Sequence, residues 1–298
     1  MDILSLSHIA KRFGGKQVLT DVSFLVPEHT VFGFVGQNGA GKTTTMKLIL
    51  GLLASDSGEI SVNGRKVRYG STAANRMVGY LPDVPEFYPY MTPKEYLCFC
   101  GGITGMTAKE SRERSEELLC LVGLEQENRR IRGFSRGMKQ RLGLAQALFG
   151  RPKLLICDEP TSALDPVGRK ELLDLLVSVK EQATVLFSTH ILSDVEHICD
   201  EIAFLHGGRI VLQGSLEEVR ARRKATATEL ELEQPKDAQR LLSMFPCLKP
   251  IGSNRLLLEM AGALPDILHA LADKRMPILR IERQEASLED LFLEVVGK

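Results

Sequence analysis

The chain carries Gly36-Gln37-Asn38-Gly39-Ala40-Gly41-Lys42-Thr43-Thr44, a glycine-rich stretch between an apolar run at 31–35 and a segment with helical spacing at 45–50. A strand, a glycine-rich turn and a helix in this order let backbone N–H groups and a helix N-terminus converge on one anion. A chance glycine turn is the alternative, and the complete Gly-x-x-x-x-Gly-Lys-Thr pattern disfavours it. We therefore predict that this stretch binds nucleotide phosphates.

The residue types of this stretch suit a nucleotide and its metal ion. Glycines let the backbone follow the phosphates without Cβ clashes, and Lys42 places an ammonium against the β- and γ-phosphates. The Thr43 hydroxyl can coordinate Mg²⁺, and Thr44 can donate to the α-phosphate. The candidate nucleotide-binding residues here are Gly36, Asn38, Gly39, Ala40, Gly41, Lys42, Thr43 and Thr44.

Two further apolar runs end in polar residues, the first in Asp158 and Glu159 and the second in a strand end followed by His190. Buried parallel strands deliver such groups to the carboxyl edge of a sheet. Asp158 can hold Mg²⁺ through water, and Glu159 can orient or deprotonate a hydrolytic water. His190 is either a structural histidine or a functional one, and its place favours function. The catalytic candidates are therefore Glu159, His190 and Lys42.

Three residues outside these runs are further candidates for nucleotide binding. Phe13 stands at the Gly14-Gly15 turn, where an aromatic side chain can stack on adenine; a core phenylalanine is the alternative. Ser135 is a good N-cap, and Gly137 leaves the first-turn amides of the following helix accessible. This N-terminus is a second candidate anion site, although the same pattern fits a simple capped helix.

Asp83 ends an expected strand, directly after Pro82. A carboxylate there can reach Mg²⁺ or its water, so the metal candidates are Thr43, Asp83 and Asp158. The alternative is an aspartate that caps a turn. The following segment, 84–91, is aromatic and proline-rich, and we expect it either to pack internally or to bind a partner protein.

The composition disfavours several classes of protein. The 298 residues contain equal numbers of acidic and basic side chains, so there is no electrostatic argument for nucleic acid. No apolar run approaches the roughly 20 residues that span a bilayer, and the start of the chain lacks a basic region before an apolar core. We expect a cytoplasmic chain. Its six cysteines lack zinc or redox spacing and are expected to be free thiols.

The first 220 residues show the α/β pattern of a nucleotide-binding domain. Capping boxes begin at Thr92 and Thr107, and they predict a helical insertion over about 92–150. A hairpin is expected around the turn Gly207-Gly208. The basic run at 220–224 is typical of a solvated linker.

The pattern changes after this linker. Residues 226–298 show the order β-α-β-β-α-β and then an amphipathic helix at 287–296. This order predicts a small, ferredoxin-like α+β domain. No catalytic constellation is visible in it.

Taken together and in this order, the motifs resemble those of the ATP-binding cassette (ABC) ATPases, the nucleotide-binding subunits of ABC transporters. Residues 36–44 resemble the Walker A loop, 154–159 the Walker B strand with its catalytic glutamate, 162–165 the D-loop, and His190 the switch histidine. The resemblance implies an α/β P-loop NTPase fold, with an ATPase core, a β-subdomain and a helical subdomain at 1–220. The small C-terminal α+β domain at 226–298 would be an accessory domain.

The sequence departs from the family pattern at two places. The signature Leu-Ser-Gly-Gly-Gln stands here as Phe134-Ser135-Arg136-Gly137-Met138, which keeps the serine and the second glycine that would meet the γ-phosphate of the opposite subunit. The usual glutamine after the Tyr80-Leu81-Pro82 strand is replaced by Asp83. The resemblance therefore supports phosphate binding across a dimer more firmly than the details of coupling.

The resemblance also implies a mechanism and partners. Two copies, or one copy and a related cassette, would sandwich two ATP molecules with Mg²⁺, and hydrolysis would release the dimer. This ATPase cycle would drive a separately encoded transmembrane permease through the surface at 83–91, at the cytoplasmic face of the membrane, without nucleic acid. Residues 288–295 resemble the C-terminal extension of ATPases that serve ABC-2-type exporters, which favours export. The cargo would touch the permease and is therefore not identified.

Two other classes are alternatives to a transporter subunit. A cassette protein of translation or DNA repair would carry a second cassette, long coiled coils or zinc modules, and none of these is visible. An unrelated P-loop kinase would need an acceptor site, which is also not visible.

Overall fold

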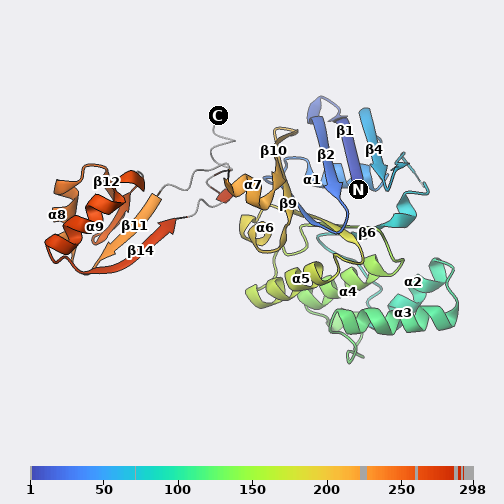
Figure 1. The fold of residues 1–298 in the computed structure, drawn as a ribbon. Coiled ribbons are helices and arrows are strands. Elements are labelled where there is room, and N and C mark those ends of the chain that lie inside the picture. Colours follow the sequence, from blue (N-terminus) through green and yellow to red (C-terminus); the bar gives the residue numbers. More distant parts are fainter. Residues whose placement is uncertain are drawn as a thin grey trace. The chain divides into compact units, whose positions relative to one another are not determined.

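The structure is a computed structural model, and it describes residues 2–70, 72–221, 227–258, 261–284, 288–289 and 291. The chain divides into two compact units, of which the first covers Met1–Leu216 and the second Glu217–Glu294 (Figure 1). Within the described residues, no helix has both the length and the apolar character needed to cross a bilayer. Of the predicted basic linker at 220–224, residues 222–224 lie outside the described residues.

The first unit is built on a ten-stranded sheet with the order β5-β4-β1-β2-β10-β9-β3-β8-β7-β6. One half is antiparallel and the other parallel, and the β9–β10 hairpin, with its turn at Gly207-Gly208 as predicted, lies between them. The antiparallel strands are β1 (Asp2–Phe13), β2 (Lys16–Pro27), β4 (Ser57–Val62) and β5 (Arg65–Lys66). The remaining strands are β3 (Val31–Val35), β6 (Val78–Leu81), β7 (Leu154–Asp158), β8 (Thr184–Thr189), β9 (Glu201–His206) and β10 (Arg209–Ser215).

Strands β3, β7 and β8 are buried along their whole length, as expected of parallel strands covered on both faces. Their apolar sequences explain why the three runs were recognisable as strands. Since parallel neighbours point the same way, the residues that follow β3, β7 and β8 all meet at one edge of the sheet.

Helices surround the parallel half. They are α1 (Lys42–Ile49), α2 (Pro93–Ile103), α3 (Ala108–Leu121), α4 (Arg136–Leu148), α5 (Pro166–Ser178) and α6 (Leu192–Ile198). The short helix α7 (Leu216–Ala221) follows β10, and all of it except Leu216 belongs to the second unit. Short 3₁₀ turns occur at η1 (Asn75–Met77) and η2 (Ile131–Gly133). In Figure 1, α2, α3 and α4 lie together within the first unit, away from β1, β2 and β4. These three helices lie within the range 92–150 for which a helical insertion is predicted.

The sequence signals that start these helices are confirmed. Thr92 and Thr107 each form a complete capping box with a glutamate three residues later. Ser135 caps α4, because its Oγ accepts a hydrogen bond from the Met138 N–H at 3.2 Å.

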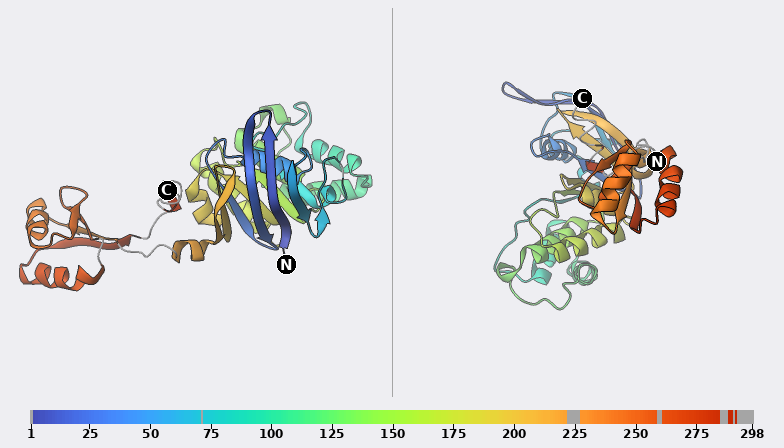
Figure 2. Two further views of the ribbon diagram at one scale, coloured as in Figure 1. Left: turned by 90° about the horizontal axis from the view of Figure 1, so that it is seen from above. Right: turned by 90° about the vertical axis from the view of Figure 1, so that its left-hand side faces the viewer.

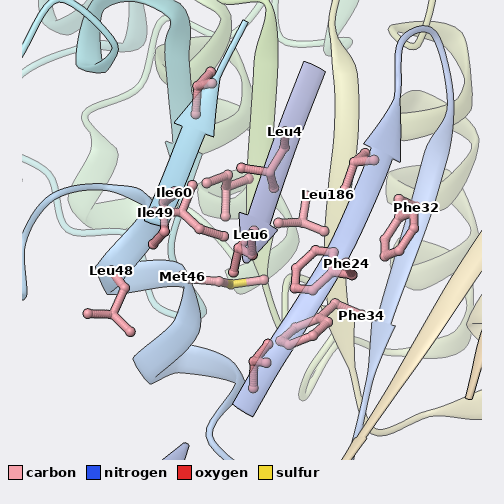
Figure 3. Close-up of a cluster of buried hydrophobic side chains, with 14 of the residues drawn as sticks. Leu4, Leu6, Phe24, Phe32, Phe34, Met46, Leu48, Ile49, Ile60 and Leu186 are labelled. Atoms are coloured by element: carbon pink, nitrogen blue, oxygen red, sulfur yellow. The ribbon is translucent and has the colours of Figure 1, made fainter. Parts of the chain in front are cut away.

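A buried cluster fixes the strand and the helix on either side of the glycine-rich stretch. Phe24 of β2 stacks on Phe32 and Phe34 of β3, with ring centroids 5.7 and 5.2 Å apart, and Met46 of α1 joins them (Figure 3). Burial of a side chain of this size contributes about 1.5–3 kcal/mol. The ends of β3 and α1 are therefore rigid supports for the turn between them.

The second unit has a four-stranded antiparallel sheet with the order β12-β13-β11-β14 (Figure 2). Its elements are β11 (Ala227–Leu232), α8 (Pro235–Met244), β12 (Leu248–Pro250), β13 (Arg255–Leu258), η3 (Ala261–Ala263), α9 (Leu264–Asp273) and β14 (Ile278–Gln284). Leu230, Leu241, Leu256 and Ile267 form part of a core that belongs to this unit. The predicted ferredoxin-like order is confirmed, whereas most of the predicted helix at 287–296 lies outside the described residues.

Candidate functional site

The glycine-rich turn after β3 has a backbone that only glycine adopts easily. Gly39 and Gly41 have φ angles of 82° and 111°, in the left-handed region. A Cβ on Gly41 would lie 2.7 Å from Leu19 Cδ2, and one on Gly36 would lie 2.6 Å from the Leu205 carbonyl oxygen. Conformation and space therefore both require glycine, and the turn presents its amides at the start of α1.

A pocket of about 340 Å³ opens beside this turn. Its lining residues are Phe13, Val18, Asn38, Gly39, Gly41, Lys42, Thr43, Thr44 and Glu159. All of them except Val18 were predicted from the sequence. Phe13 is the last residue of β1 rather than part of the turn, its side chain is 46% exposed, and the Lys11 ammonium lies 5.4 Å from its ring centroid. The ring is thus available for stacking at the rim of the pocket.

Three charged or ionisable residues that are distant in the sequence contact one another beside the glycine-rich turn, and two of them, Lys42 and Glu159, line the pocket. Lys42 Nζ donates to the Gly36 carbonyl oxygen at 2.6 Å and lies 3.0 Å from Glu159 Oε1. The other carboxylate oxygen, Oε2, lies 2.7 Å from His190 Nδ1. Lys42 and Glu159 are only 5% and 15% exposed, so each supplies a counter-charge that the other needs in this environment. All three catalytic candidates are therefore in one contact chain.

Glu159 occupies a strained backbone position that the sequence did not reveal. Its φ is 48°, an uncommon value for a residue with a side chain, which costs about 1–3 kcal/mol. Ser188 of β8 holds this turn: the Glu159 N–H donates to the Ser188 carbonyl oxygen and to its Oγ, each at 3.1 Å. Ser188 Oγ in turn donates to Asp158 Oδ1 at 2.7 Å. The only sequence signal for Ser188 was a polar residue directly after the apolar run Val185–Phe187 of a buried strand.

The chain after Glu159 is held by a second network that the sequence analysis missed. Asp194 of α6 is 2% exposed and accepts hydrogen bonds from Thr161 Oγ1 at 2.8 Å and from Arg169 Nε at 2.5 Å. A buried carboxylate needs such partners, and here they connect α5 and α6 to the turn that carries Glu159.

The donor set at the pocket suits a hard cation. Thr43, which carries a hydroxyl, lines the pocket, and Asp158, at the end of β7, is 4% exposed. Burial and then the Asp158 carboxylate raise the pKa of Tyr80 to about 12, and burial raises the pKa of the Cys157 thiol, so both stay uncharged at neutral pH. Among the described residues no group of three or more His, Cys, Asp and Glu side chains could hold a metal. This arrangement fits Mg²⁺, which is usually bound by one or two protein oxygens with phosphate and water.

The remaining predicted residues lie around or away from the pocket. Gly36 and Ala40 shape the turn, since Gly36 accepts from Lys42 and the Ala40 N–H donates to the Gln37 carbonyl oxygen at 3.1 Å. Ser135 and Gly137 lie at the start of α4, and neither lines the pocket. Their roles in nucleotide binding stay predictions.

Asp83 does not line the pocket either. Its carboxylate contacts Ser162 Oγ, and Arg136 Nη2 lies 3.2 Å from its Oδ1. The predicted role of Asp83 as a metal ligand stays a prediction, and the observed partners are a hydroxyl and a guanidinium.

The sequence is similar to those of known ATP-binding proteins of ABC transporters. The family "ABC transporter" matches residues 19–162, and the family "ATP-binding protein DrrA1-3-like, C-terminal domain" matches residues 214–296. The chain is 39% identical over 305 residues to an uncharacterised ABC transporter ATP-binding protein of Bacillus subtilis (strain 168), YxlF, with 99% of both chains covered. It is 32% identical over 303 residues to the bacitracin transport ATP-binding protein BcrA of Bacillus licheniformis, covering 99% of this chain and 97% of the relative.

A solved structure shows a similar fold. The structure of cbiO1 from Clostridium perfringens, part of the ABC transporter complex cbiONQ, is 25% identical to this chain and superposes with a TM-score of 0.68. The match covers 82% of this chain and 95% of cbiO1.

Proposed function

The chain belongs to the family of ABC transporter ATP-binding proteins, which hydrolyse ATP, and on this premise we propose that it powers a separately encoded exporter permease. The observation that carries the proposal is the contact chain Lys42–Glu159–His190 beside a glycine turn and an exposed aromatic ring. The similarity to a bacitracin transport protein and the DrrA-like C-terminal domain support export.

The residues in and beside the pocket have different roles in the proposed hydrolysis. The turn amides and Lys42 bind the phosphates, and Phe13 stacks on the adenine. Lys42 faces Glu159 in this structure, and a γ-phosphate that takes the place of Glu159 as the partner of Lys42 leaves the carboxylate free to accept a proton from water. His190, held to Glu159 at 2.7 Å, then donates to the charge that develops on the transferring phosphoryl group. Thr43 and Asp158 would hold Mg²⁺, which neutralises phosphate charge when bound.

The proposal includes a dimer and a membrane partner. Two copies, or this chain and a related cassette, sandwich two ATP molecules, each between one pocket and the Ser135–Gly137 turn of the other subunit. Nothing in the net charge of zero favours nucleic acid.

The permease is proposed to bind the aromatic segment after Asp83, at the cytoplasmic face of the membrane. Tyr88 and Tyr90 are 45% and 59% exposed, and Tyr88 packs edge-on against Phe99 with centroids 5.5 Å apart. An exposed aromatic cluster of this kind is typical of a protein-binding surface.

The test is the substitution Glu159→Gln, which keeps the shape of the side chain and removes its basicity. ATP should bind and persist, because no group accepts the proton of the attacking water. Gel filtration with ATP and Mg²⁺ should then show a dimer, while Glu181→Gln, an exposed glutamate after α5, should behave as the parent chain does. A chain that holds ATP and stays a monomer would contradict the sandwich mechanism.

A further inference from the structure

Two of the residues that depart from the family pattern, Asp83 and Arg136, touch each other. Arg136 Nη2 lies 3.2 Å from Asp83 Oδ1 and 3.3 Å from Ser162 Oγ, and Ser162 Oγ also contacts Asp83 Oδ1. We propose that Asp83 and Arg136 act as one charge pair, bridged by Ser162, that positions the Ser135–Gly137 turn for the ATP held by a second subunit. This inference rests on the proposed ATP sandwich.

The pair joins three segments of the first unit. Asp83 follows β6, Ser162 lies in the turn after β7, and Arg136 is the first residue of α4. The Ser162 N–H also donates to the Glu159 carbonyl oxygen at 3.0 Å. The start of α4 is therefore linked, through two side chains, to the turn that carries the catalytic glutamate.

One face of α4 attaches to the segment around Asp83. Arg136, Gln140 and Gly143 are spaced by four and three residues, so they lie on the same side of the helix. Gln140 is fully buried, and its Nε2 donates to the Asp83 carbonyl oxygen at 2.5 Å. A Cβ on Gly143 would lie 2.7 Å from Leu81 Cδ1, which shows how closely the helix approaches β6. Because of these contacts, a displacement of Asp83 displaces the start of α4.

The charge of Arg136 explains why its partner must be acidic. The two side chains are 43% and 48% exposed, so the pair adds little to the stability of the fold, but it determines where the guanidinium lies. Held by Asp83 and Ser162 through its Nη2, the guanidinium has its charge paired beside Gly137, the next residue of the chain. Without Asp83, the cation is free to take up phosphate itself or to block the turn amides; without Arg136, the Asp83 carboxylate stands unpaired near the approaching anion.

In the family pattern, position 83 is a glutamine and position 136 is a glycine. That combination is also matched, because neither residue carries a charge. Exchanging one residue at a time creates a mismatch, and exchanging both removes it. This expectation distinguishes a functional pair from two independent surface residues.

The experiment compares the parent chain with Asp83→Gln, Arg136→Gly and the double variant. Each single variant should lower kcat for ATP about fivefold to tenfold and weaken ATP-dependent dimerisation of the Glu159→Gln background by a similar factor. The KM for ATP should change less than twofold, since neither residue lines the pocket. The double variant should recover to within about twofold of the parent. Arg132→Gly, at an exposed arginine near α4, controls for the loss of a positive charge and should leave kcat unchanged.

Thermal unfolding of every variant shows whether a loss of activity comes from misfolding. A variant that unfolds at the parent's temperature has lost activity because the Ser135–Gly137 turn is misplaced. If the glycine variants do not fold, the set Asp83→Asn, Arg136→Gln and their double variant makes the same comparison with side chains of similar size. If the losses in kcat and in dimerisation of the two single variants add up in the double variant, the proposal that the two residues act as a pair is overturned. An increased Mg²⁺ requirement that is confined to the Asp83 variants and not relieved at Arg136 would also overturn the proposal, because it would make Asp83 a metal ligand.

The proposed function fails in a different way. If the Glu159→Gln background binds ATP and does not dimerise, the sandwich is overturned and this role of the pair with it. If the background dimerises and the variants show additive losses, only the pair is overturned.

Discussion

Glu159 is the residue on which the site depends, because it contacts both Lys42 and His190 from a left-handed backbone position. Strain of this kind persists only where the surroundings determine it. Here the contacts from Ser188 hold the backbone of Glu159. A bound nucleotide phosphate would compete with the Glu159 carboxylate for the Lys42 ammonium. Two residues test this arrangement: Phe13, where we expect the adenine to stack, and Ser188, which holds the strained backbone of Glu159.

Phe13→Ala should weaken ATP binding by about 1–2 kcal/mol, because it removes an aromatic face at the rim of the pocket. Calorimetric titration with ATP measures this loss. The side chain is 46% exposed, so the unfolding midpoint should change little, and Phe13→Tyr should bind as the parent does. Unchanged affinity in Phe13→Ala would leave Phe13 without a role in the site.

Ser188→Ala should lower kcat about tenfold or more, because it removes the hydroxyl that Asp158 and the Glu159 N–H share. The KM for ATP should change less than kcat, since Ser188 does not line the pocket. Steady-state ATPase kinetics separate the two constants. Ser178→Ala, which removes an exposed hydroxyl on α5, is the matched control, and equal kcat in both variants would count against the supporting role.

At the scale of elements, the ends of β3, β7 and β8 explain the site. These neighbouring strands run in parallel, so Gly36, Glu159 and His190 follow them at one edge of the sheet. Helices α2 to α4 form a separate group whose starts are defined by their caps. The caps of α2 and α3, Thr92 and Thr107, are therefore expected to stabilise the fold without taking part in hydrolysis.

Thr107→Ala should destabilise the chain by about 1 kcal/mol, because it removes the side chain that accepts the Glu110 N–H at the start of α3. Chemical denaturation measures the change in the free energy of unfolding. Thr92→Ala, in the equivalent box of α2, should cost a similar amount, and the ATPase rate should be unchanged in both. A loss of activity with unchanged stability would show that the helix has a role beyond folding.

At the scale of the whole molecule, each unit has a hydrophobic core of its own. Phe32 and Met46 belong to one cluster, and Leu230 and Leu256 belong to another. Separate cores are the condition for domains that fold independently.

Deleting residues 226–298 should therefore leave the first unit folded and able to bind ATP, since every residue of the pocket lies before the deletion. Circular dichroism during heating and calorimetry with ATP test the two parts of this expectation. A truncated chain that does not bind ATP would mean that the predicted boundary between 220 and 226 is wrong.

Much of this protein could be predicted from local sequence. The glycine turn, the two capping boxes and the strand order of the second unit depend on residues close together in the chain, and local backbone chemistry is sufficient for them. Eight of the nine residues that line the pocket carry motif or aromatic signals of this kind, among them Phe13 and Glu159.

Contacts between distant segments needed the tertiary structure. The position of Glu159 between Lys42 and His190, the support from Ser188, and the pairing of Asp83 with Arg136 all follow from the order β3-β8-β7-β6 and from the way α4 packs on β6. Local sequence patterns indicate that each strand ends near a polar residue. They do not indicate which strand ends become neighbours in the sheet. That choice is made by the burial of whole strands and helices against one another, and it decides which charges meet.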